Sequence, residues 1–155
     1  MPQTIGSRVI RQAPLLRFDD AVRDAATQVV DAGLPALPVV DGRERYCGIF
    51  GEREFITALF PGYVQALGGA AFVPESVDAA IERRHGCWLE PVAQYMNAEH
   101  VDIATDFSDV GLAEIFIHHR VLIVPVTDGG AVRGLITRND FFQALVDRLR
   151  DEAEA

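Results

Sequence analysis

The sequence predicts an α+β (α/β) fold made of two similar halves, each with the order β-α-β-β-α, related by pseudo-two-fold symmetry. The first observation is an apolar block that occurs twice, as ALPVVD at residues 36–41 and as IVPVTD at residues 123–128. The second is the segment that follows each block, GIFGEREF at residues 48–55 and GLITRNDF at residues 134–141. A repeat this long indicates a tandem pair rather than a solenoid, so we expect two half-structures with a cleft between them.

The composition favours one compact unit. The chain has 155 residues, of which 49% are hydrophobic, and this is sufficient for a shared core. No apolar run approaches the roughly 20 residues that span a bilayer, and residues 1–8 lack the apolar stretch of a secretory signal. Cys47 and Cys87 form no C-x-x-C motif. We therefore expect a cytoplasmic protein that does not enter a membrane.

The net charge argues against one class of partner. At −9, the chain is repelled by the phosphate backbone of DNA or RNA, so we expect no nucleic-acid partner. The C-terminal segment DEAEA at residues 151–155 contributes to this charge and is expected to form the solvated end of the last helix.

The first repeat is predicted over residues 1–60. Asp19 and Asp20 suit the N-terminus of a helix, where carboxylates accept from free N–H groups, and Gly33 is a plausible C-cap. Asp41-Gly42 is a turn signal between two apolar runs. The expected elements are a strand at 15–18, a helix at 21–32, strands at 37–40 and 46–50, and a helix at 52–60.

The second repeat is predicted over residues 92–155. Ser108 is expected to cap its first helix, and residues 127–130 to form its turn. The expected elements are a strand at 101–104, a helix at 108–119, strands at 121–126 and 132–136, and a helix at 139–150. Apolar residues recur along this last helix at Phe141, Phe142, Leu145, Val146 and Leu149.

Residues 61–91 connect the two repeats and are too many for a simple linker. Pro74 can begin a helix, and residues 74–84 have a helical pattern of apolar positions. We expect this inserted helix to pack near the interface of the two halves.

The doubled pattern of Pro-Val-x-Asp, a turn, and a glycine-led helix start resembles a tandem pair of cystathionine-β-synthase (CBS) domains, known as a Bateman module. The resemblance covers residues 8–60 and 92–150. It implies a regulatory module without a cofactor of its own, which binds an adenosine ligand (AMP, ADP, ATP or S-adenosylmethionine) and signals to an unknown protein. It also implies a homodimer that rests on the helices after each motif, with Phe55 and Phe141 at the interface.

The resemblance assigns roles within one cleft. Thr137 and Asp140 match the family's ribose-binding pair, and three-residue spacing at a helix start places both on one face. The helix N-terminus adds free N–H groups for a phosphate, with Arg138 and Arg120 as candidate cations. The adenine pocket is expected to come from the first repeat, from Ala13, Pro14, Leu34, Pro35 and Ala36.

The first repeat departs from this pattern. Gly51 stands where the motif has a threonine, and Glu54 replaces the aspartate. We therefore expect a weak or empty second site, formed by Gly51, Glu54, Val101, Val121 and Leu122. The apolar residues 34–35 and 122–123 stand where family members that bind charged nucleotides often carry His or Arg, which argues against a tight polyphosphate site.

Simpler roles stand beside these assignments. Asp140 can serve only as a helix-terminal acid and Thr137 as an ordinary N-cap, and capping is compatible with ribose binding. Neighbouring His118 and His119 point about 100° apart on a helix, and no metal site is expected. Arg8, Arg11 and Arg17 are scattered and are expected to be solvated.

Three functions remain open at this point. The first is the adenosine-sensing module, and the second is a ligand-independent scaffold for dimerisation or docking that keeps the fold with degenerate sites. The third is an enzyme that uses the cleft between the repeats. No nucleophile–base pair, P-loop or zinc-protease motif is present in the sequence, so we expect no catalytic residues.

Overall fold

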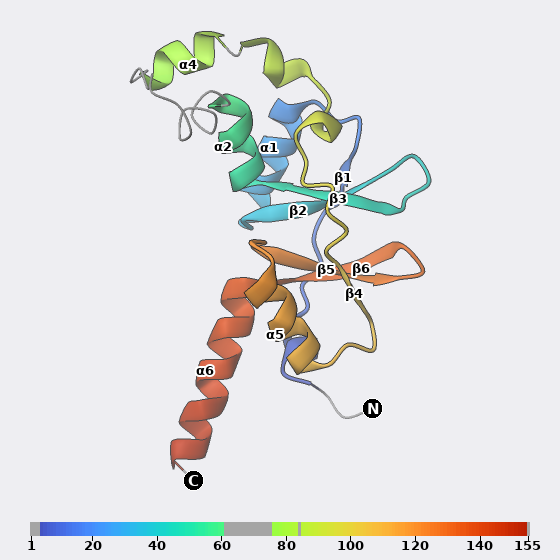
Figure 1. Ribbon diagram of the computed structural model, residues 1–155, viewed down its shortest axis with the longest axis vertical. Coiled ribbons are helices and arrows are strands. Elements are labelled where there is room, and N and C mark those ends of the chain that lie inside the picture. The colour runs from blue at the N-terminus through green and yellow to red at the C-terminus, as the bar shows by residue number, and fades with distance from the viewer. Residues whose placement is uncertain (1–3, 61–75, 84, 155) are drawn as a thin grey trace.

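The computed structural model, which describes residues 4–60, 76–83 and 85–154, consists of two stacked halves (Figure 1). Each half contains a three-stranded sheet, with the order β1-β2-β3 in one and β4-β5-β6 in the other. In both sheets the first pair of strands is parallel and the second pair is antiparallel. The predicted α+β fold with two β-α-β-β-α units is therefore confirmed.

The element bounds follow the predictions closely. The first half contains β1 (Leu16–Arg17), α1 (Val22–Ala32), β2 (Ala36–Val40), β3 (Tyr46–Gly51) and α2 (Glu52–Leu59). The second contains β4 (Ile103–Ala104), α5 (Asp109–His118), β5 (Ile123–Asp128), β6 (Ala131–Thr137) and α6 (Arg138–Glu154). Between and before them lie α4 (Val77–Arg83) and the short 3-10 helices η1 (Gly6–Val9), η2 (His85–Leu89) and η3 (Val92–Gln94).

Two of the predicted caps form where the sequence places them, but Asp19 and Asp20 do not cap α1. The N-cap of α1 is Ala21, without a side-chain hydrogen bond, and the Asp20 carboxylate instead accepts from the N–H of Arg17 at 2.9 Å. Gly33 ends α1 with a left-handed backbone, φ +67°, which glycine adopts without steric cost. Ser108 accepts a hydrogen bond from the N–H of Gly111 at 3.0 Å and so caps α5. Part of the connector, residues 61–75, lies outside the described residues.

The connector helix α4 does not lie where the sequence suggested. It contacts η2, which packs on α1, at the end of the first half remote from the second half (Figure 1). The expectation of a helix at the interface of the halves is therefore wrong for α4. A helical pattern predicts the helix but contains no information about which neighbour covers it.

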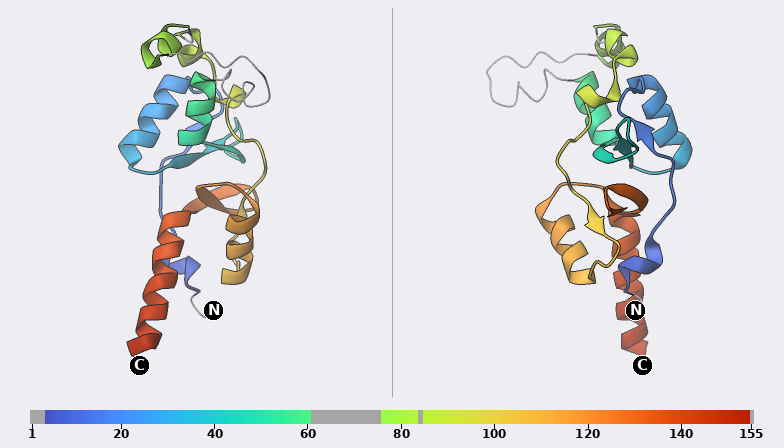
Figure 2. Two further views of the ribbon diagram at one scale, coloured as in Figure 1. Left: turned by 60° about the vertical axis from the view of Figure 1, so that its left-hand side comes forward. Right: turned by 90° about the vertical axis from the view of Figure 1, so that its right-hand side faces the viewer.

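The core lies between the two sheets and continues through both halves. Every residue of β2 is buried, as are the first five residues of β5. Figure 2 shows the reason, because the helices of each half lie on the outer face of its sheet and the inner faces meet. Strands covered on both faces have continuous rather than alternating apolar runs, which explains the two repeated blocks.

Each repeat also contributes a segment to the sheet of the other. Arg11, which precedes β1, pairs with Leu135 of β6 through N···O distances of 2.8 and 3.0 Å. Asn97, which precedes β4, pairs in the same way with Ile49 of β3 at 2.8 and 3.0 Å. Figure 1 shows the N-terminal segment against the second half before the chain enters the first. We call these two places the crossings.

The crossings explain the repeated glycines. A Cβ on Gly134 would lie 2.7 Å from Ile10 Cγ2 and 2.9 Å from the Arg11 carbonyl oxygen. A Cβ on Gly48 would meet Met96 Sδ at 2.7 Å and the Asn97 carbonyl oxygen at 2.9 Å. Both glycines are therefore required by the close approach of the crossing segment, and no positive φ is involved.

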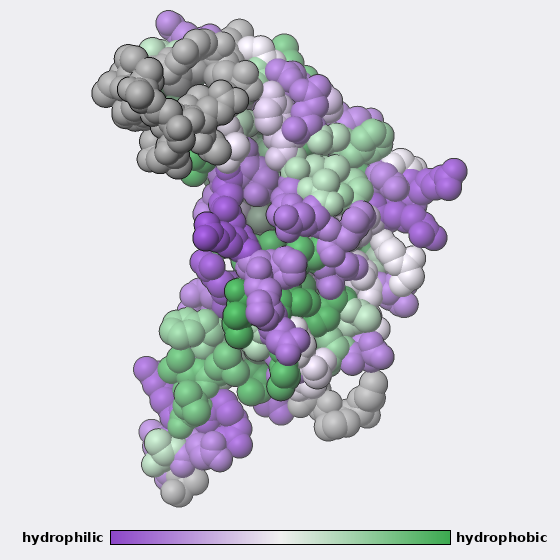
Figure 3. Space-filling model, viewed as in Figure 1, coloured by the Kyte–Doolittle hydropathy of each residue, from purple (hydrophilic) through white to green (hydrophobic). Residues whose placement is uncertain are grey.

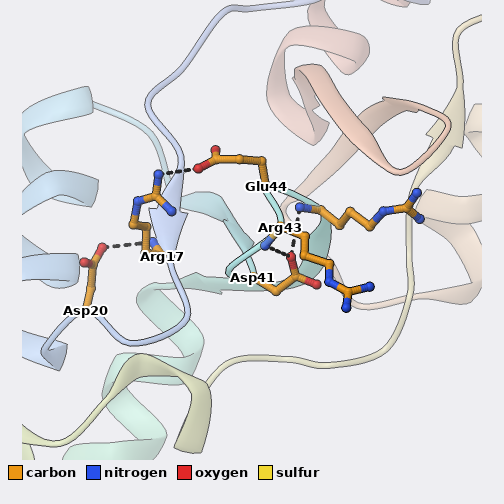
Figure 4. A network of polar contacts seen from close by, with 6 residues as sticks. Arg17, Asp20, Asp41, Arg43 and Glu44 are labelled. Atoms are coloured by element: carbon orange, nitrogen blue, oxygen red, sulfur yellow. Dashed lines mark hydrogen bonds and ion pairs between the residues drawn. The ribbon is translucent and has the colours of Figure 1, made fainter.

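A polar network stabilises the β2–β3 turn, on the side of the first half (Figure 4). The Asp41 carboxylate accepts hydrogen bonds from the N–H groups of Arg43 at 2.8 Å and Arg45 at 3.1 Å, and these bonds lower the pKa of Asp41. Arg17 pairs with Glu44 of the same turn, so Arg17 is not simply solvated as expected. Within the described residues, no helix has the length and apolar character needed to cross a membrane.

We expect Gly134→Ala to destabilise the protein by about 1–3 kcal/mol, because the added methyl group must displace backbone at the crossing. Urea denaturation would measure this change. Gly42→Ala is the matched control, since a Cβ at Gly42 has its nearest neighbour, Phe18, at 3.9 Å. Equal stability of the two variants would contradict the steric role assigned to Gly134.

Candidate functional site

A cleft of about 520 Å³ opens between the two repeats. The first repeat contributes the loop between α1 and β2, and the second contributes the start of α6. The cleft is lined by Arg11, Gly33, Leu34, Pro35, Glu52, Leu122, Thr137, Arg138, Asn139, Asp140 and Phe142. It is therefore built from segments that are distant in sequence.

Thr137 and Asp140 come together as the spacing predicted. Thr137 ends β6, and its Oγ1 accepts a hydrogen bond from the N–H of Asp140 at 2.9 Å. The N–H of Arg138 donates to the Leu122 carbonyl at 2.9 Å, which fixes the helix start against the β5 side of the cleft. Thr137 thus caps α6, and both side chains line the cleft.

Asp140 also makes an ion pair that the sequence did not reveal. Arg11 Nε lies 2.5 Å from Asp140 Oδ2, and Arg11 Nη2 lies 3.0 Å from Oδ1, which is a bidentate arrangement. The guanidinium lowers the pKa of Asp140, and the carboxylate raises the pKa of Arg11. Arg11 is exposed, as expected, but its guanidinium is also engaged by Asp140, which the sequence did not indicate.

Only part of the expected adenine pocket lines this cleft. Leu34 and Pro35 do, on the loop that leads into β2. Ala36 is buried within β2, with its Cβ against Gly51. Ala13 is half-buried and packs on the core, and Pro14 is exposed, but neither lines the cleft.

The two candidate phosphate cations separate. Arg138 lines the cleft, whereas Arg120 lies in a different hollow on the other side of the repeat interface. Leu122, which was assigned to the weak second site, lines the first cleft instead. Arg11 also lines this cleft, although the sequence gave no reason to assign it there.

The second hollow measures about 650 Å³ and is the pseudo-symmetric counterpart of the first. Val101 and Val121 line it, as expected, whereas Gly51 and Glu54 do not. Arg53 donates a hydrogen bond to the Arg120 carbonyl across it. The remaining lining residues are mostly polar: Asn97, Glu99, His100, His118 and His119.

Gly51 does more than omit a hydroxyl group. A Cβ at this position would lie 2.2 Å from the Pro35 carbonyl oxygen and 2.4 Å from the Ala36 Cβ. The N–H of Glu52 donates to the same Pro35 oxygen at 3.0 Å, as Arg138 does to Leu122 in the second repeat. The first repeat is therefore closed at the point where the second presents Thr137.

The acidic residues of the two motifs differ in electrostatic environment. Burial raises the pKa of Glu54, and the charge of neighbouring Arg53 opposes this shift only in part. The Asp140 pKa is lowered by its pair with Arg11. The fold therefore favours the protonated form of Glu54 and the ionised form of Asp140.

Of the two expected dimer residues, Phe141 is covered within the chain and Phe55 is half-buried. Phe141 is only 5% exposed and stacks on Phe116 with ring centroids 5.9 Å apart. Phe55 lies against Trp88 at 5.3 Å. The exposed apolar side chains of α6 are instead Phe142 at 61%, Leu145 at 36% and Leu149 at 66%. Figure 3 shows apolar surface along this helix.

Histidine and cysteine residues do not gather into a metal site in the described part of the chain, where no three His, Cys, Asp or Glu side chains are placed to hold an ion. Cys87 is buried and Cys47 is half-buried, and the two are not joined by a disulfide. Burial raises the pKa of the Cys47 thiol, which disfavours the reactive thiolate.

Comparisons with known proteins agree with this architecture. The CBS domain family model matches residues 7–61. Solved CBS-pair structures match over both repeats. CBSX2 from Arabidopsis thaliana superimposes with a TM-score of 0.71 at 15% identity, over 97% of this chain and 99% of that one. The chain has the fold of a CBS-domain pair.

Two further solved structures share this CBS-pair fold. CBSX2 in complex with AMP matches with a TM-score of 0.66 at 19% identity, over 94% of this chain and 98% of that one. A putative acetoin utilization protein from Vibrio cholerae matches with a TM-score of 0.69 at 17% identity, over 100% and 98%. No curated protein sequence matches the chain.

We expect Glu54→Gln to raise Tm at pH 7, because burial penalises the ionised form of Glu54 in the folded protein. A folded-state pKa above the ordinary 4.5 means that ionisation lowers stability as pH rises through that range. The gain should therefore disappear below about pH 4.5. Thermal melts from pH 3.5 to 7 would check this, with exposed Glu52→Gln as control. A gain that persists at low pH would contradict the assignment.

Proposed function

We propose that this CBS pair is a regulatory module that binds an adenosine-containing ligand in the cleft between its repeats and signals to a partner protein. The observation that carries the proposal is the convergence of Thr137 and Asp140 with Leu34 and Pro35 in one cleft. It receives support from CBSX2, which has this fold and was solved in complex with AMP.

The ribose is assigned to the start of α6. The Asp140 carboxylate can accept from both the 2′- and 3′-hydroxyl groups, and hydrogen bonds to a charged group contribute roughly 1.5–3 kcal/mol each. Thr137 Oγ1 already accepts from the Asp140 N–H and holds the carboxylate toward the cleft. This arrangement needs no movement of α6.

The base is assigned to the apolar wall. Leu34 and Pro35 on one side and Leu122 on the other present apolar surface from both repeats. A phosphate is assigned to the Arg138 side chain and the positive end of the α6 dipole. Because the ligand contacts both repeats, it favours the relative arrangement of the two repeats to which it binds most tightly. The difference in affinity between the arrangements shifts their populations, and this shift is the signal.

The second hollow is not assigned an equal affinity. The position of Thr137 is taken in the first repeat by Gly51, where no side chain fits. We therefore propose one principal ligand site in each chain. No catalytic step is part of the proposal.

We expect Asp140→Asn to weaken AMP binding by about tenfold or more, because the charged acceptor of the ribose is removed. Isothermal titration calorimetry would measure this, with AMP, ADP, ATP and S-adenosylmethionine as ligands. Glu54→Gln is the matched control in the first repeat and should change affinity little. Equal losses in both variants would refute the one-site assignment. Failure of every ligand to bind the wild type would refute the sensing function.

The exposed face of α6 favours a second role, assembly of two copies. Phe142, Leu145 and Leu149 recur at three- and four-residue spacing, which forms a continuous apolar stripe. The dimer expected from the sequence is therefore proposed to use this stripe, since Phe141 is buried in its own chain. Such a dimer is compatible with ligand sensing, and it is also what a ligand-independent scaffold would require.

We expect Leu149→Asp to shift the protein from dimer to monomer, because a charge in an apolar interface is strongly unfavourable. Light scattering coupled to size-exclusion chromatography would measure the mass. Val110→Asp is the control, since Val110 is an equally exposed apolar residue on α5, at 71%. A monomeric wild type, or a Leu149→Asp dimer, would exclude the stripe as the interface.

A further inference from the structure

The ion pair between Arg11 and Asp140 occupies the group that a ribose would need. Its two nitrogen–oxygen contacts, 2.5 and 3.0 Å, engage both carboxylate oxygens of Asp140. Asp140 is the less exposed partner, with 15% of its side chain accessible, against 52% for Arg11. Arg11 therefore has room to turn toward the cleft, whereas Asp140 is held by its own helix.

The backbone of Arg11 is fixed while its side chain is free to turn. Both its N–H and its carbonyl are hydrogen-bonded to Leu135 at the crossing. The guanidinium extends from this fixed backbone and lines the cleft, where Arg138 is the second cation. A ligand group in the cleft can therefore be reached by Arg11 through a change of rotamer alone.

The pseudo-symmetric hollow lacks this pair. Asn97 occupies the position of Arg11 at the other crossing, and its side chain accepts from the N–H of Glu99 at 3.0 Å. Glu54 occupies the position of Asp140, and the charge of neighbouring Arg53 only partly opposes the burial that raises its pKa. The arginine–carboxylate pair is therefore a property of one cleft and not of the fold.

We propose that Arg11 determines the specificity of the cleft by exchanging Asp140 for an anionic group of the ligand. This exchange rests on the proposed function. In one step, the ribose hydroxyl groups replace the guanidinium on Asp140, and the guanidinium pairs with the phosphate of the same ligand. A ligand without an anion leaves Arg11 without its charge partner, so neutral adenosine is disfavoured.

The charges in the cleft narrow the ligand class further. Arg11 and Arg138 supply two positive charges, which match the single phosphate group of a nucleoside monophosphate. A triphosphate brings excess negative charge beside Glu52 and Asp140, which also line the cleft. S-adenosylmethionine carries a sulfonium and an ammonium group against one carboxylate, and this net positive charge is unfavourable beside two guanidinium groups. The structure therefore favours a nucleoside monophosphate.

Calorimetry with AMP and adenosine on three proteins tests the exchange: the wild type, Arg11→Gln and Arg17→Gln. Arg17 is the matched control because it makes an exposed pair with Glu44 (Figure 4), and neither residue lines the cleft. In Arg11→Gln we expect AMP affinity to fall about tenfold or more while adenosine affinity is unchanged or rises. The preference for AMP over adenosine thus falls by at least about tenfold, and Arg17→Gln retains the wild-type preference.

Two results would overturn the exchange while leaving the proposed function intact. Equal losses for AMP and adenosine in Arg11→Gln would mean that Arg11 only positions Asp140. Unchanged affinities for both ligands would mean that Arg11 does not take part in binding. If neither compound binds the wild type, the proposed function fails and the exchange fails with it. Thermal melts of each variant confirm that the exposed substitution leaves the fold intact.

Discussion

The two crossings are the constraint on which the rest of this molecule depends. Each brings the segment before the first strand of one repeat against the last strand of the other, with a glycine at the point of contact. Because the segments cross, the two sheets are held face to face and share one core. The crossing at Leu135 also places Arg11 beside the start of α6, so the same backbone pairing that joins the halves assembles the cleft.

The asymmetry of the clefts follows from small differences on this symmetric frame. Both repeats hold the helix start by a hydrogen bond to the residue before the central strand, Pro35 in one and Leu122 in the other. In the first repeat the backbones approach so closely that only glycine fits, and burial raises the pKa of the acid beyond it. In the second, a threonine fits and the acid is paired. A symmetric scaffold therefore presents one cleft with a threonine and an ion-paired acid.

The sequence predicted the fold well because the information was local and doubled. Periodicity, caps and turns each concern residues a few positions apart. Because the pattern occurs twice, each repeat also supported the prediction made for the other. It could not predict the Arg11–Asp140 pair, whose members are separated by 129 positions. Nor could it decide between Phe141 and Phe142 as the exposed residue, because neighbours on a helix differ by about 100° and only the packing of Phe116 settles the choice. The sequence shows that Gly51 lacks the threonine hydroxyl group. It does not show that the Pro35 carbonyl leaves no space for a side chain at this position.

The crossings also have a consequence for how the chain folds. A tandem repeat whose units contact only through their surfaces can fold one unit at a time. Here neither sheet gains its crossing strand until the opposite repeat is in place, since Arg11 must meet Leu135 and Asn97 must meet Ile49. The first of these closures joins residues far apart in the chain, which is entropically slow to form. The cooperative unit of folding is therefore the pair, and a single excised repeat would expose the backbone groups that its missing neighbour satisfies.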